Sequence, residues 1–120
     1  MELVLAGVVV FGQAQADVPG EVRFGVHVRP ILSHNCIQCH GPDENHRKAK
    51  LRLDVEIGLF GGSGDNRIVV PGKPAESLLY QIITAHDPDD RMPPEESKKK
   101  LSVDEIATIK RWIEQGAEWE

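Results

Sequence analysis

Two cysteines stand three residues apart, and a histidine follows the second directly, in the segment Cys36-Ile37-Gln38-Cys39-His40, called the Cys-His box below. These are the only cysteines in the 120 residues. Thiols at positions i and i+3 can form thioethers with the two vinyl groups of a haem, and the adjoining histidine reaches the iron from the same side. The pattern therefore predicts one covalently bound haem c, attached at Cys36 and Cys39, with His40 as an axial ligand.

Three other chemistries use two neighbouring cysteines. A structural zinc site usually needs four ligands, and His34 and His46 lie near the box without the paired spacing of zinc modules. A thioredoxin-like dithiol follows a strand of a parallel sheet, whereas the residues before Cys36 have a helical pattern. A disulfide across two intervening residues would brace little of the chain. We therefore favour haem attachment.

A six-coordinate haem iron needs a second axial ligand, and Met92 is the only methionine apart from Met1. It lies 92 minus 40, or 52, residues beyond His40, in a proline-rich segment that restricts the backbone. A thioether paired with histidine favours ferrous iron and raises the reduction potential. Two alternatives stay open on these grounds: Met92 fills a gap or lies at the surface, or the ligand is one of the other histidines, His27, His34, His46 or His86.

The size and charge of the chain narrow its class. A chain of 120 residues has room for one domain, and only six side chains are aromatic, so a buried cofactor could supply part of the core. With 14 basic and 19 acidic residues the formal charge is -5, which argues against a nucleic-acid partner. The one dense cationic run, Lys98 to Lys100, is interpreted as a solvated loop that could still steer a partner.

Residues 1–16 have the features of a secretory signal peptide. An apolar run over residues 3–11 is too short to span a bilayer, and Ala14-Gln15-Ala16 provides a small-x-small cleavage pattern. We expect a mature chain of residues 17–120 with no membrane span, exported to the periplasm or cell envelope. Because the first residues carry Glu2 and no Lys or Arg, retention of the segment as a buried strand stays an alternative.

The first half of the chain is expected to deliver the box on a helix. Apolar spacings of three and four between Phe24 and Cys39 are helical, but Pro30 would break a helix interior, so we predict extended Val26 to Arg29 and a helix beginning at Pro30. Leu51 to Asp54 alternates like a short strand, Val55 to Phe60 suits one helical turn, and the glycines over residues 61–64 suit a flexible loop.

The second half contains two predicted helices around an irregular segment. Pro74 to Ile83 reads as one helix with Pro74 in its first turn, and its buried stripe is Leu78, Leu79, Ile82 and Ile83. Residues 87–94 hold three prolines and several acidic residues, so we predict a loop. Ser102 and Glu105 form a capping box for a last helix that ends near Gly116.

These elements predict an all-α domain in which helices pack around the haem. The residues expected around the haem or at the crossing of the first and last helices are Phe24, Ile31, Leu32, Leu79, Ile109, Trp112 and Ile113.

Several linked motifs occur in one order: Val28-Arg29-Pro30-Ile31-Leu32, the box with Gly41-Pro42-Asp43, Lys50-Leu51-Arg52-Leu53-Asp54, Val70-Pro71-Gly72-Lys73-Pro74, Ser77-Leu78-Leu79, Asp90-Arg91-Met92-Pro93-Pro94, Leu101-Ser102, and Trp112 through Ala117. The chain thereby resembles the planctomycete-type cytochrome c domain, a class I-like c-type cytochrome, from about Phe24 to Trp119. The resemblance implies that Met92 is the distal ligand. It also implies that the domain can be the N-terminal module of a longer secreted protein.

The expected function is one-electron transfer by a mono-haem domain with His40 and Met92 on the iron. We expect redox proteins or domains as partners and no enzymatic reaction. One alternative is a catalytic or gas-sensing haem protein with an open distal site, in which His86 is the acid-base candidate. Another is a haem that is chiefly structural within a larger enzyme.

Overall fold

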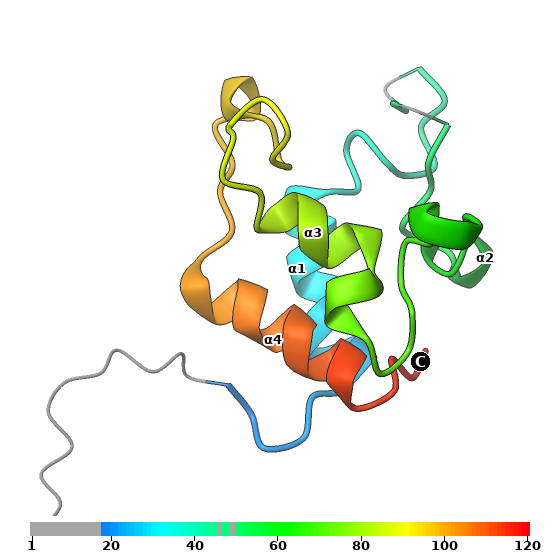
Figure 1. The fold of residues 1–120 in the computed structure, drawn as a ribbon. Helices are drawn as coiled ribbons and strands as arrows, with labels where there is room; N and C mark the ends of the chain where they lie inside the picture. The colour runs from blue at the N-terminus through cyan, green and yellow to red at the C-terminus, as the bar shows by residue number, and fades with distance from the viewer. Residues whose placement is uncertain (1–17, 46, 49) are drawn as a thin grey trace, which may run out of the picture.

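The fold is built from short helices joined by long irregular segments (Figure 1). The computed structural model describes residues 18–45, 47, 48 and 50–120, so the predicted signal peptide and His46 lie outside the described residues. The α-helices are α1 (Arg29–Asn35), α2 (Glu56–Leu59), α3 (Leu78–Ile83) and α4 (Val103–Glu114). One π-helical turn, η1 (Phe24–Val28), is wider than an α-helix. Three 3-10 turns are tighter: η2 (Gly64–Asn66), η3 (Pro74–Glu76) and η4 (Glu95–Ser97). The described part of the chain contains no strand, in agreement with an all-α class.

The N-terminal helix begins earlier than predicted. The expected extended conformation of Val26 to Arg29 is wrong, because η1 is a π-helical turn that runs directly into α1. The Arg29 N–H donates to the Phe24 carbonyl, five residues back. Pro30 then occupies the first turn of α1. A proline clashes with the carbonyl four residues before it in a regular α-helix, so the wider π turn gives a physical reason why the helix passes through Pro30.

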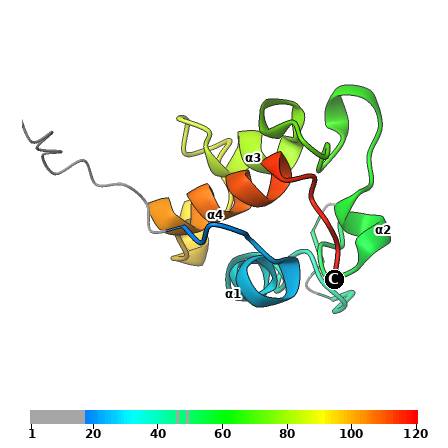
Figure 2. The same ribbon diagram turned by 90° about the horizontal axis from the view of Figure 1, so that it is seen from below.

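Helix α4 contributes Ile109, Trp112 and Ile113 to the hydrophobic core. Its predicted capping box is present: the Glu105 N–H donates to Ser102 Oγ at 3.1 Å, and the Ser102 N–H donates to Glu105 Oε1 at 2.9 Å. The α4 face packs against η1 and α3, and α1 crosses this layer (Figure 2). All seven predicted core residues are buried, with Phe24 and Trp112 in ring contact at 5.1 Å.

The predicted strand over Leu51 to Asp54 is absent, and that prediction is wrong. Arg52 instead donates from Nε and Nη2 to the two Asp54 carboxylate oxygens at 3.1 and 2.6 Å. The Leu53 N–H donates to the His40 carbonyl at 2.7 Å and not to a partner strand. The same segment then packs tightly on α2, since a Cβ on Gly58 would lie 1.8 Å from the Arg52 carbonyl oxygen. The predicted helical turn over Val55 to Phe60 is confirmed as α2.

The predicted helix from Pro74 to Ile83 is divided in two at Ser77. Ser77 is fully buried and extended, with ψ of 119°. Its hydroxyl donates to the Lys73 carbonyl at 2.9 Å and accepts from the Val70 N–H at 2.8 Å. Because these bonds compete with helical pairing, η3 ends at Glu76 and α3 begins at Leu78. Of the predicted stripe, Leu79 and Ile83 are buried, whereas Leu78 and Ile82 are half-buried.

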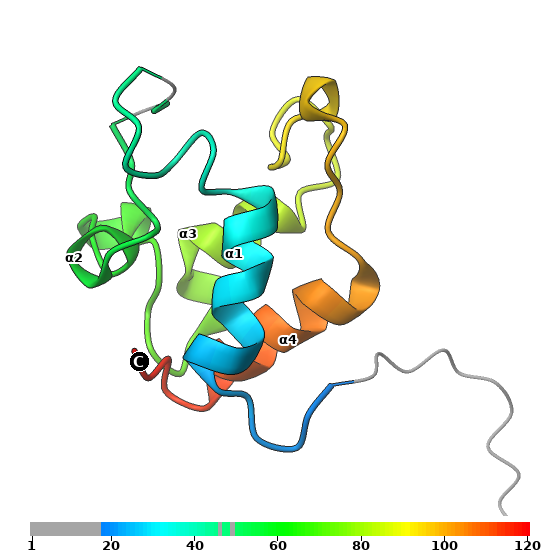
Figure 3. The same cartoon turned by 180° about the vertical axis from the view of Figure 1, so that it is seen from behind.

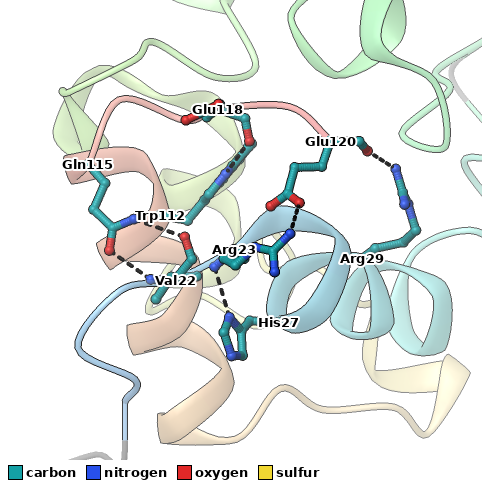
Figure 4. A network of polar contacts seen from close by, with 8 residues as sticks. All are labelled: Val22, Arg23, His27, Arg29, Trp112, Gln115, Glu118 and Glu120. Carbon is teal, nitrogen blue, oxygen red and sulfur yellow. Dashed lines mark hydrogen bonds and ion pairs between the residues drawn. The ribbon is translucent and has the colours of Figure 1, made fainter.

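The end of the described chain is fastened to the start of η1 (Figure 4). The Gln115 amide makes two hydrogen bonds of 2.9 Å with the backbone N–H and carbonyl of Val22. Arg23 pairs with the Glu120 carboxylate at 2.6 Å, and Arg29 donates to the Glu120 carbonyl. These bonds fix where the N-terminal helix starts. They thereby help to set where its far end, with the Cys-His box, lies relative to α4.

Candidate functional site

The Cys-His box follows directly after α1. Cys36 caps the helix with an N–H bond of 2.8 Å to the Leu32 carbonyl. The chain then makes one further turn, in which the N–H groups of Cys39 and His40 donate to the Cys36 carbonyl at 3.2 and 2.9 Å. Both thiols are half-buried and free of a disulfide. The prediction that the helix delivers the two cysteines near its end is confirmed.

The ring of His40 is oriented by the backbone of the following loop. Its Nδ1 lies 3.2 Å from the Lys48 carbonyl oxygen. A carbonyl oxygen can only accept, so this contact requires the proton on Nδ1 and leaves the Nε2 lone pair free. Metal-binding histidines are commonly oriented in this way. The His40 carbonyl in turn accepts from the Leu53 N–H at 2.7 Å, so the segment before α2 holds the box in place.

Gly41 allows the chain to turn back immediately after His40. A Cβ at this position would lie 2.3 Å from the Ile37 carbonyl oxygen and 2.6 Å from the Ile37 side chain. Arg47 fixes the turn from outside, donating to the Gly41 carbonyl at 2.8 Å and the Pro42 carbonyl at 3.1 Å. The close approach therefore needs a glycine next to the box.

Met92 lies in a loop, as predicted, and its side chain is 41% exposed. Its N–H donates to the Ile82 carbonyl at 3.3 Å, which ties the loop to the end of α3. We call residues 87–100 the Met92 segment. This segment and the C-terminal end of α1 lie at the same end of the helical frame (Figure 3).

The four predicted site residues come together around one small cavity. This box cavity has a volume of about 40 Å³, and its walls include Cys36, Cys39, His40 and Met92. A larger Met92 cavity of about 580 Å³ shares three wall residues with it, Met92, Pro93 and Lys99. Pockets of 300–1,000 Å³ are typical of cofactor sites. The seven core residues at the helix crossing line neither cavity.

The charges around the site are mostly positive. Arg91 and the three lysines Lys98, Lys99 and Lys100 line the Met92 cavity beside one carboxylate, Glu95. Burial raises the pKa of the Cys36 thiol to about 11, against an opposing effect of the Lys99 charge. The thiol is therefore protonated at neutral pH in the haem-free chain.

Lys99 is the site residue that sequence reasoning missed. Lys98 and Lys100 are exposed, as the predicted solvated loop requires, but Lys99 is half-buried and its amine donates to the His34 carbonyl at 2.8 Å. No pattern in the sequence distinguishes it from its two neighbours.

The other histidines have different surroundings. His34 is exposed, and His27 Nδ1 accepts a 2.8 Å hydrogen bond from the Arg23 N–H. His86 lines the Met92 cavity together with Met92. In residues 18–45, 47, 48 and 50–120, no three His, Cys, Asp or Glu side chains are grouped closely enough to hold a metal ion.

The donor set fits a haem attached through thioethers. It combines two free thiols, an imidazole with an available Nε2 and a thioether, which all line the small box cavity, and of these four residues Met92 alone also lines the larger cavity. A helical frame with this set of donors indicates the class of c-type cytochromes.

Comparison with known proteins agrees with this class. The family model of the Planctomycete cytochrome C matches residues 36–96, from the first cysteine of the box to a point within the Met92 segment. The chain belongs to this family. Membership implies haem c and indicates haem-based electron transfer, the general role of such domains. No match was found among curated proteins or among solved structures. Within the described residues, no helix has the length and apolar character needed to cross a membrane.

Proposed function

We propose that the chain is a one-electron carrier with a single haem c, bound by thioethers at Cys36 and Cys39 and ligated axially by His40 and Met92. The observation that supports this proposal best is the common cavity of these four side chains. They come from two segments about fifty residues apart in the sequence.

Each part of the site has a separate task. A haem held by these residues would supply an iron that can change between the ferric and ferrous states. The Lys48 carbonyl holds the His40 ring with Nε2 available and makes the imidazole a stronger donor. The Met92 sulfur is a soft ligand that favours ferrous iron, and Pro93 and Pro94 restrict the backbone that carries it.

Covalent attachment is tested by expression with a cytochrome c maturation system. The intact protein should gain the mass of one haem and keep its colour through acid-acetone extraction. The variant with both Cys36→Ser and Cys39→Ser should lose the haem under the same treatment. A wild-type haem that extracts freely, or a second haem per chain, would refute this part of the proposal.

The same proposal extends to location and partners. Residues 1–16 act as a signal peptide, residues 17–120 form the cytochrome domain in the periplasm or cell envelope, and electrons pass to and from redox proteins or domains. N-terminal sequencing of exported material should begin at Asp17. An intact Met1 on haem-loaded protein would show that the segment is retained.

A second candidate function is supported by the Met92 cavity. His86 lines the same space as Met92, and Met92 is 41% exposed. If Met92 leaves the iron open, His86 is the residue placed to act as an acid or base on a ligand such as peroxide. Rapid carbon monoxide binding and peroxide turnover by the wild type would favour this function over electron transfer.

A further inference from the structure

We infer that Lys99 is a positioning residue, which holds the Met92 segment against the Cys-His box and so keeps the Met92 sulfur on the iron. This inference rests on the proposed ligation by Met92. It starts from the unequal surroundings of three consecutive lysines. Lys98 and Lys100 are exposed, whereas Lys99 is half-buried and lies in the walls of both cavities.

The amine of Lys99 reaches the end of α1. It donates to the His34 carbonyl at 2.8 Å and approaches the Gln38 Oε1 atom, inside the box, at 3.5 Å. The last carbonyls of a helix lack partners within the helix, and that end carries partial negative charge. An ammonium group therefore satisfies a free acceptor there and also interacts favourably with the helix dipole.

The backbone of Lys99 is coupled to the residues beside Met92. The Lys99 N–H donates to Ser97 Oγ at 3.2 Å, and Ser97 Oγ donates to the Pro94 carbonyl at 2.6 Å. Pro94 is two residues from Met92. In the part of the chain that the structure describes, both hydrogen bonds found between residues 87–100 and residues 34–40 come from Lys99. One side chain thus links the segment with the distal ligand to the segment with the proximal ligand.

The remaining bonds of the loop hold it to itself and to α3. The N–H groups of Asp90 and Arg91 donate to the Asp87 carbonyl at 3.0 and 3.1 Å, and the Met92 N–H donates to the Ile82 carbonyl at 3.3 Å. None of these bonds reaches the box. Loss of the Lys99 amine should therefore let the loop move away from the box while α3 and α4 stay folded.

The test compares three variants of the haem-loaded protein, Lys98→Ala, Lys99→Ala and Lys100→Ala, each of which removes one positive charge. The measurement is the rate at which imidazole binds the ferric iron, which requires the Met92 sulfur to leave. We expect Lys99→Ala to bind imidazole roughly tenfold faster, which corresponds to about 1.4 kcal/mol. Lys98→Ala and Lys100→Ala remove a charge from the same cavity without removing a bond to the box, so they measure the effect of charge alone, and Lys99→Ala should exceed both of them severalfold.

Two further variants separate positioning from charge and guard against misfolding. Lys99→Arg keeps a cationic donor and should restore most of the wild-type rate and of the near-infrared sulfur-to-iron band. Gln38→Glu makes the second acceptor anionic and should slow imidazole binding about two- to threefold. That slowing is measurable even if Lys99→Ala does not load with haem, and an unchanged rate in Gln38→Glu would then overturn the inference.

Three further outcomes of the imidazole-binding test would overturn the role of Lys99. Equal acceleration in all three alanine variants would show a general charge effect and overturn the positioning role. If the wild type shows the sulfur-to-iron band and Lys99→Ala binds imidazole at the wild-type rate, the positioning role of Lys99 is overturned while the proposed Met92 ligation stands. A wild type without the band would refute the proposed Met92 ligation, and the role of Lys99 would fail with it.

Discussion

Replacement of Met92 by alanine separates the ligand role of this residue from its packing role. Full burial of a methionine side chain stabilises a fold by about 1.5–3 kcal/mol. Met92 is 41% exposed, so the packing lost in Met92→Ala is about 1–2 kcal/mol. Domains of this kind are stable by about 5–15 kcal/mol, so we expect the variant to fold and to keep its covalent haem.

The change at the iron should be much larger than the change in folding. The oxidised wild type should be low-spin with the near-infrared sulfur-to-iron band, and Met92→Ala should lose that band and bind carbon monoxide rapidly when reduced. The reduction potential should fall on the order of 0.1 V, because the thioether that favours ferrous iron is gone. Val103→Ala, which truncates an exposed apolar residue on α4, is the matched control and should change none of these properties.

One result would refute the assignment of electron transfer. It is a wild type that is already high-spin, binds carbon monoxide rapidly and turns over peroxide, with Met92→Ala altering none of these. A low-spin wild type that is insensitive to Met92→Ala would keep the function and move the ligand. His86 would then be tested next, because it lines the same cavity.

Three other predictions concern the frame and the thiols. Ser102→Ala removes the cap of α4 and should lower the free energy of unfolding by about 1 kcal/mol in a denaturant titration; no change would mean that the cap is energetically silent. Gly41→Ala places a Cβ 2.3 Å from the Ile37 carbonyl oxygen and should sharply reduce the yield of haem-loaded protein, whereas Gly20→Ala, which meets nothing within 4 Å, should not. In haem-free protein, burial raises the pKa of Cys36 from 9.0 to about 11, so the unfolded state releases its proton first, and stability should fall on the order of 2 kcal/mol as the pH rises from 9 to 11. Cys36→Ser should remove most of this pH dependence.

Local patterns predicted the parts of the site that depend on neighbouring residues. The box needs only the order of five residues, and the α4 cap needs only Ser102 three positions before Glu105. The irregular Met92 loop follows from prolines that oppose both helix and sheet. In each case the residues that decide the structure lie within a few positions of one another, so a linear sequence contains the information.

Other features depended on partners that a local pattern does not name. The alternation of Leu51 to Asp54 is the usual mark of a strand, but the described residues offer it no partner strand, and the Leu53 N–H bonds to the His40 carbonyl. Ser77 divides the predicted helix because its hydroxyl bonds to Val70, seven residues back. Pro30 was expected to start the helix, and the π turn before it removes the clash on which that expectation depended.

Two contacts that complete the site come from residues whose type gives no sign of them, and the predicted solvated loop is confirmed at Lys98 and Lys100 but not at Lys99. His40 is oriented by a carbonyl, a group that every residue carries, so nothing in the type of Lys48 marks it. Lys99 differs from Lys98 and Lys100 only because the chain brings its amine to the end of α1. The Cys-His box indicates haem c from sequence alone, and Met92 is the proposed second ligand. Lys99 is the residue that we infer to hold the box and Met92 together. Because lysine side chains are usually exposed to solvent, this role is identified only from the folded chain.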